Sequence, residues 1–284
     1  MKSFSSEAQA AIVERYPSHF RPDWWSRAKI TIGLGTAVAL FLFGIAQLDI
    51  PFHRLSDGMA RLGGFLRLML PPDPGSWAEA LKYLNALGET VSIAFLGTLG
   101  GALLALPVAL LAARNVVANR IVHFFSRRSL DTIRGVDILI WALIWVGVVG
   151  LGPFAGILAV ICSDFGTFGK LFSEAIEAAD KNPAEGVRSA GGNHLHSVRF
   201  GLLPQVFPIL LSQVLYYFES NTRSATIIGI VGAGGIGLQL AEQIRVLEWQ
   251  KVSFLILLIL IAVSAIDWIS GKLRFAIIGR RAVA

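Results

Sequence analysis

The stretch Asn182–Pro204, NPAEGVRSAGGNHLHSVRFGLLP, is a polar segment between long apolar runs. Asn182 is expected to cap a short helix, because its side-chain oxygen can accept a hydrogen bond from a backbone N–H. Pro183 suits the first helical position, where its missing N–H would have no partner anyway. The carboxylate of Glu185 is placed to reach back to the N–H of the cap residue. The pattern predicts a short, capped helix.

The second half of this stretch predicts another helix. Gly191 is expected to end the first helix in a left-handed conformation, which glycine adopts easily. Asn193 can then cap a second short helix that runs towards Phe200. Leu203 and Pro204 open the next apolar run. A helix–glycine–helix unit between two apolar runs is typical of a docking segment.

The composition indicates that most of this chain is not exposed to water. Of its 284 residues, 54% are hydrophobic and 15% are charged, whereas soluble domains average about 25% charged residues. Several runs approach the roughly 20 apolar residues that a helix needs to cross a bilayer. We therefore expect an all-α, polytopic membrane protein. The single cysteine, Cys162, excludes a disulfide framework and a thiolate metal site.

Apolar runs define the expected spans. The N-terminal segment, residues 1–29, is polar and ends in Trp24-Trp25, so it is expected to be cytoplasmic or to lie at the membrane interface. Residues 114–134 are expected to form a basic loop. The run between Asp137 and Asp164 can be one span, or two spans split at Gly152-Pro153. The other expected spans are Ile30–Leu48, Tyr83–Ala113, Leu203–Tyr217 and Val252–Ile269.

The distribution of charge decides whether the chain has five spans or six. Both ends of the chain are basic, so both are expected in the cytoplasm, which requires an even number of spans. Splitting the run at Gly152-Pro153 gives six. This topology makes residues 30–270 the transmembrane domain and residues 271–284 a basic cytoplasmic tail, and it puts the segment Asn182–Pro204 in the cytoplasm between spans four and five. The basic residues assigned to the outer side are Arg54, Arg61, Arg67, Lys82, Arg223, Arg245 and Lys251.

A glycine-rich run, Ile227–Gly237, follows the fifth span. It is too short to cross a membrane, so a broken or re-entrant helix that lines a cavity is expected. Gly232, Gly234 and Gly235 are candidates for a gate, and close helix packing is the alternative. The run also matches the dinucleotide fingerprint G-x-G-x-x-G, but the acidic residue that this fingerprint needs further along the chain is missing, so we interpret the match as chance.

Polar residues at the end of the fifth span are candidates for the path of a transported solute. Glu219 and Arg223 are four apart, in the order that favours a helical ion pair. An arginine also suits an anionic oxygen group, because its guanidinium is planar and always charged. A purely structural pair remains equally open. The other candidates in this segment are Asn221, Ser224 and Thr226.

Span four carries its own charged residues. Asp164 lies deepest and is a candidate for a buried polar group, whereas the residues nearer the cytoplasm fit a belt at the membrane interface. Lys170 is expected to pair with Glu174 at i,i+4, and the acids of this span are expected to contact Arg127 or Arg128. The histidines show no spacing typical of a metal site. No catalytic group and no P-loop are apparent, so we expect neither an enzyme nor a resident cofactor.

Three motifs resemble a known family. Glu185, Gly191, Leu203 and Pro204 fall at the offsets of the cytoplasmic loop of importer-type ABC permeases, although Gly186, Val187 and Gly201 depart from that pattern. At these positions the segment resembles the corresponding loops of the subgroup for phosphonate import. The segments FGTFGKLFSEAIE (Phe165–Glu177) and FESNTRSATIIGIVGAGGIG (Phe218–Gly237) also resemble that subgroup, and the resemblance covers residues 75–275.

The resemblance implies the permease subunit of an ABC importer for phosphonate, phosphate or phosphite in a bacterial cytoplasmic membrane. Its implied partners are a second copy of the chain, two ATP-binding subunits, and a periplasmic or lipid-anchored solute-binding protein. ATP and magnesium would be bound by the ATPases, and the segment Asn182–Phe200 would seat in a cleft of each. Membrane lipid is expected as a contact and nucleic acid is not. The rival functions are an ion-coupled secondary transporter, an ABC permease for a different small solute, and an integral membrane enzyme.

Overall fold

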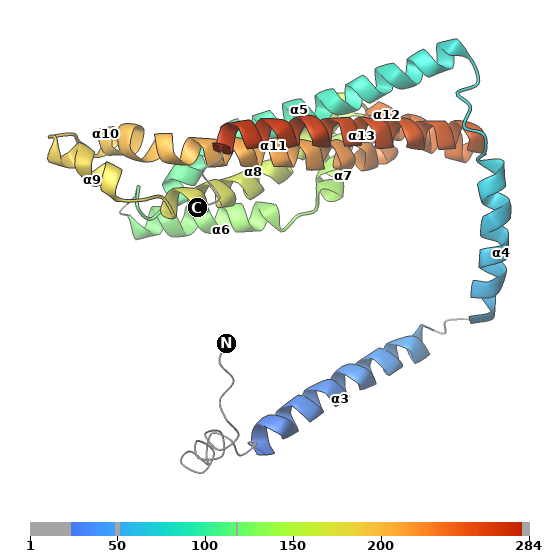
Figure 1. Ribbon diagram of the computed structural model, residues 1–284, viewed down its shortest axis with the longest axis horizontal. Coiled ribbons are helices and arrows are strands. Elements are labelled where there is room, and N and C mark those ends of the chain that lie inside the picture. The colour runs from blue at the N-terminus through green and yellow to red at the C-terminus, as the bar shows by residue number, and fades with distance from the viewer. Residues whose placement is uncertain (1–23, 49–51, 118, 280–284) are drawn as a thin grey trace, which may run out of the picture. The chain divides into compact units, whose positions relative to one another are not determined.

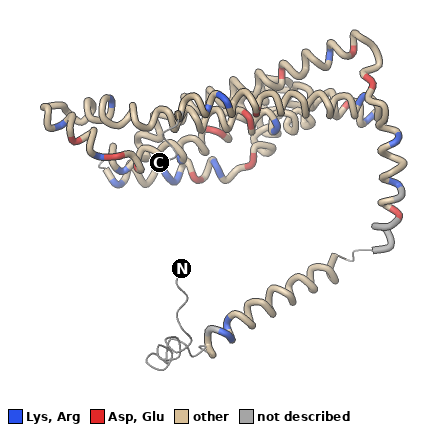
Figure 2. The backbone as a smooth tube through the Cα atoms, in the orientation of Figure 1, with Lys and Arg blue, Asp and Glu red and all other residues tan. Residues whose placement is uncertain are grey.

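The computed structural model describes residues 24–48, 52–117 and 119–279, and every regular element within them is a helix. The chain divides into two units, Met1–Phe65 and Leu66–Ala284. The first unit contains α3 (Trp24–Gln47) and most of α4 (Phe52–Leu68). In Figure 2, the tube of α3 is tan apart from a blue segment near its beginning, where Arg27 and Lys29 lie. Helix α3 is apolar and, with 24 residues, long enough to span a bilayer.

The second unit is a helical bundle organised around α5 (Trp77–Ala112). The helices α8 (Pro153–Glu177) and α11 (Leu203–Ile228) pack along it, and α13 (Trp249–Ile278) packs along α11 (Figure 1). The short helices α9 (Asn182–Ser189) and α10 (His194–His196) lie at one end of the bundle, and the beginnings of α5 and α13 lie at the other. The remaining elements are α6 (Arg120–Arg134), α7 (Ile138–Val149), the π-helical turns η1 (Ser197–Leu202) and η2 (Gly229–Ala233), and α12 (Gly235–Arg245).

Small residues allow α5 and α8 to pack closely. A Cβ atom added to Gly97 would lie 2.5 Å from Cβ of Val160, and one added to Gly101 would lie 2.7 Å from Cβ of Asp164. Such distances are far shorter than van der Waals contact, so only glycine fits there. Small residues at a helix interface let two backbones approach closely in this way.

Three clusters of buried side chains follow α5 along its length. The cluster near its beginning joins Tyr83 to Ile236 of α12 and Leu255 of α13. The middle cluster joins Ile93 to residues of α7, α8 and α11. The third, near the end of α5, is built around stacked Phe168 and Phe172 of α8, whose ring centroids are 5.0 Å apart. Helix α5 therefore contacts a different set of helices at each level.

The expected number of spans agrees with the structure, but one span is made of different residues from those expected. Five helical segments of the described chain are long and apolar enough to cross a membrane, and a sixth arises if α6 and α7 form one broken span. These two helices meet at a bend of 85°. Helix α7 has 12 residues, or about 18 Å at 1.5 Å per residue, which is too short to cross alone.

Residues 114–134 are not the loop that the sequence predicted, because α6 occupies most of them. Two further boundaries differ. Helix α3 already begins at Trp24, within the segment 1–29, and α13 continues to Ile278, into the expected tail 271–284. Residues 1–23 and 280–284 of these two segments lie outside the described residues.

Candidate functional site

The polar segment Asn182–Pro204 forms a compact unit with the beginning of the fifth span. Helix α10, the turn η1 and α11 follow one another without a break, and His194–Ala233 meets the length and hydropathy requirements of one span. Helix α9 packs against this rod at Gly201, where an added Cβ atom would lie 2.6 Å from Cα of Ala184. The two backbones are therefore in direct contact at this point.

The start of α9 differs from the capping pattern that the sequence predicted. Asn182 is not the cap residue: Lys181 holds that position, and no side chain caps it. Instead the Asp180 carboxylate accepts hydrogen bonds from the backbone N–H and the side-chain amide of Asn182, at 3.1 and 3.2 Å. The helix begins one residue early because Asp180 supplies the acceptor. The capping box predicted for Glu185 is therefore wrong, and Pro183 takes the second helical position instead of the predicted first, still within the first turn.

The end of this unit agrees with the prediction. Gly191 has a φ of +88°, a left-handed conformation that favours glycine. The side chain of Asn193 caps α10 by accepting from the backbone N–H of His196 at 2.9 Å. Leu203 begins α11 with Pro204 in its first turn, directly after the π-helical turn η1.

Four further residues hold this unit in place. Arg188 of α9 donates to the hydroxyl of Ser197 at 3.3 Å and approaches Nδ1 of His194 at 3.2 Å. The other ring nitrogen of His194 lies 2.7 Å from the carbonyl oxygen of Val116, in the segment that follows α5. Gln205 donates to the carbonyl oxygen of Asp180 at 3.1 Å. Sequence reasoning missed these contacts, since each depends on the fold.

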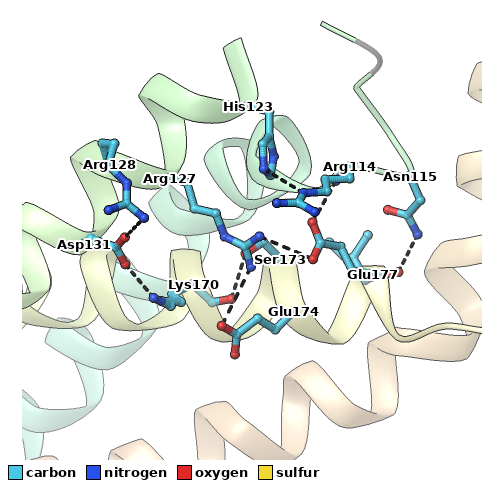
Figure 3. Close-up of polar contacts among 11 residues, drawn as sticks. Arg114, Asn115, His123, Arg127, Arg128, Asp131, Lys170, Ser173, Glu174 and Glu177 are labelled. Carbon is cyan, nitrogen blue, oxygen red and sulfur yellow. Dashed lines mark hydrogen bonds and ion pairs between the residues drawn. The ribbon is translucent and has the colours of Figure 1, made fainter. Parts of the chain in front are cut away.

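A network of charges joins α6 to α8 beside this unit (Figure 3). Arg127 lies between two acids of α8, at 3.8 Å from Glu174 and 3.5 Å from Glu177. Glu177 also accepts from the backbone N–H of Arg114 at 2.9 Å. The expected contact of these acids with Arg127 is confirmed.

The pairing predicted between Lys170 and Glu174 is wrong. Nζ of Lys170 lies 2.6 Å from the carboxylate of Asp131 on α6, which also pairs with Arg128 at 2.8 Å. The prediction failed because it treated residues 114–134 as a loop. Because α6 packs alongside α8, the carboxylate of Asp131 competes with that of Glu174 for Lys170.

Asp164 is buried, as its depth in span four suggested, and it meets one of the candidates from span five. Its carboxylate accepts from the side-chain amide of Asn221 at 2.5 Å, and the same amide donates to the hydroxyl of Thr98 at 2.8 Å. Asp164, Asn221 and Thr98 are 2%, 5% and 1% exposed. These three side chains form a polar link between α8, α11 and α5.

Glu219 pairs with Arg223, as its spacing predicted, and with a second arginine that the sequence did not indicate. Its two carboxylate oxygens lie 2.9 Å from Arg223 and 3.3 Å from Arg274 of α13. Arg223 and Arg274 therefore lie at the same level of the bundle. The topology that put Arg223 on the outer side and Arg274 in the cytoplasmic tail is wrong at this point, since one carboxylate contacts both.

The other two polar candidates of α11 bond to their own helix. The hydroxyl of Ser224 donates to the carbonyl oxygen of Ser220 at 3.3 Å, and that of Thr226 donates to Thr222 at 3.2 Å. Such bonds satisfy the hydroxyl within the helix. Thr226 is buried, and its carbonyl group lies against Gly237.

The helix break predicted in the glycine-rich run is present. Gly232, Gly234 and Gly235 have φ values of +101°, +82° and +73°, which end η2 and start α12 in a new direction. The backbone N–H of Gly152, just before α8, donates to the carbonyl oxygen of Gly232 at 2.9 Å. A helix precedes this run where the dinucleotide fingerprint needs a strand, which agrees with a chance match.

Two side chains of α5 cap the helix that follows the break. The carboxylate of Glu89 accepts from the N–H of Gly235 at 3.0 Å, and the hydroxyl of Thr90 accepts from the N–H of Ile236 at 2.8 Å. Sequence reasoning missed both residues, because their partners are distant along the chain. The one available signal was a lone carboxylate inside the apolar run Tyr83–Ala113.

Comparison with known proteins assigns this arrangement to a family. Residues 105–275 match the sequence profile of the family described as "Binding-protein-dependent transport system inner membrane component". The chain belongs to this family. It is therefore a multi-pass inner-membrane permease component of a binding-protein-dependent transport system.

Named relatives of this permease come from several bacteria. A putative phosphite transport system permease protein, HtxC, of Stutzerimonas stutzeri is 39% identical over 86% of both chains. The phosphite transport system permease protein PtxC of the same organism is 33% identical over 90% of this chain and 91% of its own. The phosphate-import permease protein PhnE of Mycolicibacterium smegmatis is 37% identical over 74% of this chain and 39% of its own length.

A solved structure agrees with the permease fold. An inward-facing structure of the MetNI methionine ABC transporter contains a chain that aligns with a TM-score of 0.63, over 71% of this chain and 99% of its own. Its sequence identity is 20%, so this likeness concerns the fold alone.

Proposed function

We propose that this permease moves a phosphorus oxyanion, namely phosphonate, phosphite or phosphate, into the cell, driven by ATP hydrolysis in its partner subunits. The observation that carries the proposal is its similarity, along most of its length, to permeases named for phosphite transport. The two segments that resemble the phosphonate subgroup support the same substrate class. They form the second half of α8 and the end of α11 with the helix break that follows it.

The segment around α9 and α10 is the proposed coupling unit. Asn182, Pro183 and Glu185 form the first half of α9, Gly191 sets the turn, and Leu203 with Pro204 begins the spanning helix. The support is mechanical: α9 touches the rod of α10, η1 and α11 at Gly201. An ATPase that grips α9 would therefore move the rod and α9 together.

We sort the path candidates by what surrounds each of them. Asp164, Asn221 and Thr226 are buried between helices, and we propose that they hold the bundle together. Glu219 is neutralised by Arg223 and Arg274, which favours a structural pair, although the Arg223 side chain remains 49% exposed. Gly232, Gly234 and Gly235 remain the proposed gate, because the helix changes direction there. Ser224 contributes a hydroxyl that is already bonded within α11.

The proposed assembly contains two copies of this permease, two ATP-binding subunits that hold ATP and magnesium, and a periplasmic or lipid-anchored solute-binding protein. Both termini lie in the cytoplasm. For the second unit, the support for this orientation is that α9 and the network around Arg127 lie at one end of the bundle, whereas the pair of Lys251 and Glu79, 2.7 Å apart, lies at the other. Chemical catalysis belongs to the ATPases.

The substrate is tested on the solute-binding partner and on the complete transporter. Binding of phosphonate, phosphite and phosphate to the purified partner is measured by calorimetry, followed by uptake of the tightest ligand into proteoliposomes. We expect one of these three to bind and to be taken up only with ATP. Tight binding of an unrelated solute, with none of the three bound, would contradict the proposed substrate class.

A further inference from the structure

A stripe of polar side chains follows one face of α5 in the half that begins at Trp77. Lys82, Asn85, Glu89 and Ser92 are spaced by three and four residues, so they lie above one another on the helix. All four are exposed or half-exposed in the protomer. The same face continues with exposed leucines, Leu96, Leu99 and Leu103. The face is therefore polar from Lys82 to Ser92 and apolar beyond Ser92.

Contact with lipid would be unfavourable for the polar half of this face. Glu89 lies about 18 Å along the helix from Trp77, at 1.5 Å per residue, and a carboxylate at such a depth normally faces an aqueous path or the interior of a bundle. Ser92 alone would tolerate lipid, because its hydroxyl donates to the carbonyl oxygen of Gly88 at 2.8 Å. Glu89, Asn85 and Lys82 carry the argument.

The stripe borders the helix that follows the break. A groove of about 450 Å³ lies between α5 and α12 and is lined by Lys82, Asn85, Glu89 and Gln239, among others. The side-chain oxygen of Gln239 is buried and has no hydrogen-bond partner among the described residues. A water molecule would satisfy this oxygen. At one end of the groove Lys82 approaches Glu242 at 4.0 Å, and Glu89 caps α12 at the other.

We propose that this face of α5, together with α12, lines the water-filled path along which the phosphorus oxyanion reaches the glycine break from the outer side. The proposal deepens the proposed function and rests on it. Lys82 stands at the mouth of the path, 4.0 Å from Glu242, with its side chain 59% exposed. Glu89 stands where the path meets the break, and Leu96 begins the apolar segment that water does not enter.

Cysteine labelling tests this directly, because a cysteine reacts as its thiolate, a charged form that water stabilises and lipid does not. Cys162 is the only cysteine, so a Cys162→Ala chain provides the background. Asn85→Cys and Ser92→Cys probe the stripe. Leu84→Cys and Phe95→Cys are matched controls, since these residues are 47% and 51% exposed on the neighbouring face of the same helix.

The complete transporter, in right-side-out membrane vesicles, is treated with a membrane-impermeant anionic methanethiosulfonate. We expect the two stripe cysteines to react at least about tenfold faster than the two controls, because only they meet water that supports a thiolate. Equal rates at all four positions would overturn the proposal. Disulfide formation between two copies through Ser92→Cys, without labelling, would also overturn it, by showing a contact between protomers.

Labelling rates do not depend on which solute is carried, so the two proposals fail separately. Uptake of a phosphorus oxyanion by the Cys162→Ala transporter, with unreactive stripe cysteines, would leave the substrate class standing and refute this path. Fast labelling of the stripe in a transporter that carries another solute would refute the substrate class, and with it the oxyanion as the occupant of the path.

Discussion

The carboxylate of Glu89, on the central helix α5, accepts a hydrogen bond from the backbone N–H of Gly235, at the first residue of α12. The N-terminus of a helix carries partial positive charge and unpaired N–H groups, so a carboxylate there is stabilising. An added Cβ atom at Gly234 would lie 2.6 Å from the same carboxylate oxygen. Glycine at this position lets Glu89 reach the helix end, and the contact joins the central helix to the proposed gate.

Replacing Glu89 by alanine is expected to loosen the gate. Loss of an N-terminal cap costs about 1 kcal/mol, which corresponds to about a fivefold shift between the closed and open positions of α12. ATP hydrolysis by the transporter without its solute-binding protein should rise by a similar factor. The measurement is the ATPase rate of the purified complex in proteoliposomes.

Glu248 provides the control for this variant. It occupies the cap position of α13 but makes no side-chain cap hydrogen bond. Glu248→Ala should leave the basal ATPase rate at its original value. An equal basal rate in Glu89→Ala and the unmodified protein would show that the Glu89 contact does not hold the gate.

Gly191→Val is expected to uncouple ATP hydrolysis from transport while the protein still reaches the membrane. A left-handed conformation costs a residue with a Cβ atom about 1–2 kcal/mol, so valine should displace the turn between α9 and α10. Gly147→Val is the control, because Gly147 lies on α7, outside the coupling unit, with no atom near its added Cβ. The ratio of substrate taken up to ATP hydrolysed is compared. A normal ratio in Gly191→Val would count against the coupling role.

Asp164→Leu is expected to destabilise the bundle, since it removes an acceptor from the buried amide of Asn221. Leaving a buried donor without one of its partners costs about 1–3 kcal/mol. Asp164→Asn keeps the shape and an acceptor oxygen, so it should cost less. Thermal unfolding in detergent gives the order of the two variants. If the leucine variant unfolds at the same temperature as the original protein, the polar link does not stabilise the bundle.

Arg223→Ala distinguishes a substrate contact from a structural pair. Because Glu219 retains Arg274, the loss of Arg223 should spare assembly. If Arg223 helps to move the anion, uptake should fall, and the double variant Glu219→Gln, Arg223→Ala should be equally impaired. Uptake is measured in both variants, with Arg274→Ala as a comparison. Normal uptake in Arg223→Ala would assign Arg223 to the structural pair alone.

The sequence predicted those features that depend on local patterns. Apolar run length predicted the spans, the glycine cluster predicted the break at Gly232, and Asn193 was recognised as a cap because its partner lies on the next turn. The burial of Asp164 followed from its depth in an apolar run. Each of these signals is contained within one helix or one turn.

The errors are of two kinds. Some are local: α6 occupies most of the expected loop 114–134, and Asp180 takes over the role expected of Asn182, which moves the start of α9. Others come from distant partners, since Lys170 pairs with Asp131 rather than with Glu174, and Glu219 gains Arg274 from the last helix. A pattern within one segment cannot reveal a charge that another helix brings close. Glu89 was missed for the same reason.

The most direct test of the central account is uptake of radiolabelled phosphite and phosphonate into proteoliposomes that contain this permease with its ATP-binding subunits. The account predicts uptake only when the solute-binding protein, ATP and magnesium are all present, and none by the permease alone under a proton or sodium gradient. Uptake by the permease alone on such a gradient, without ATP, would contradict it.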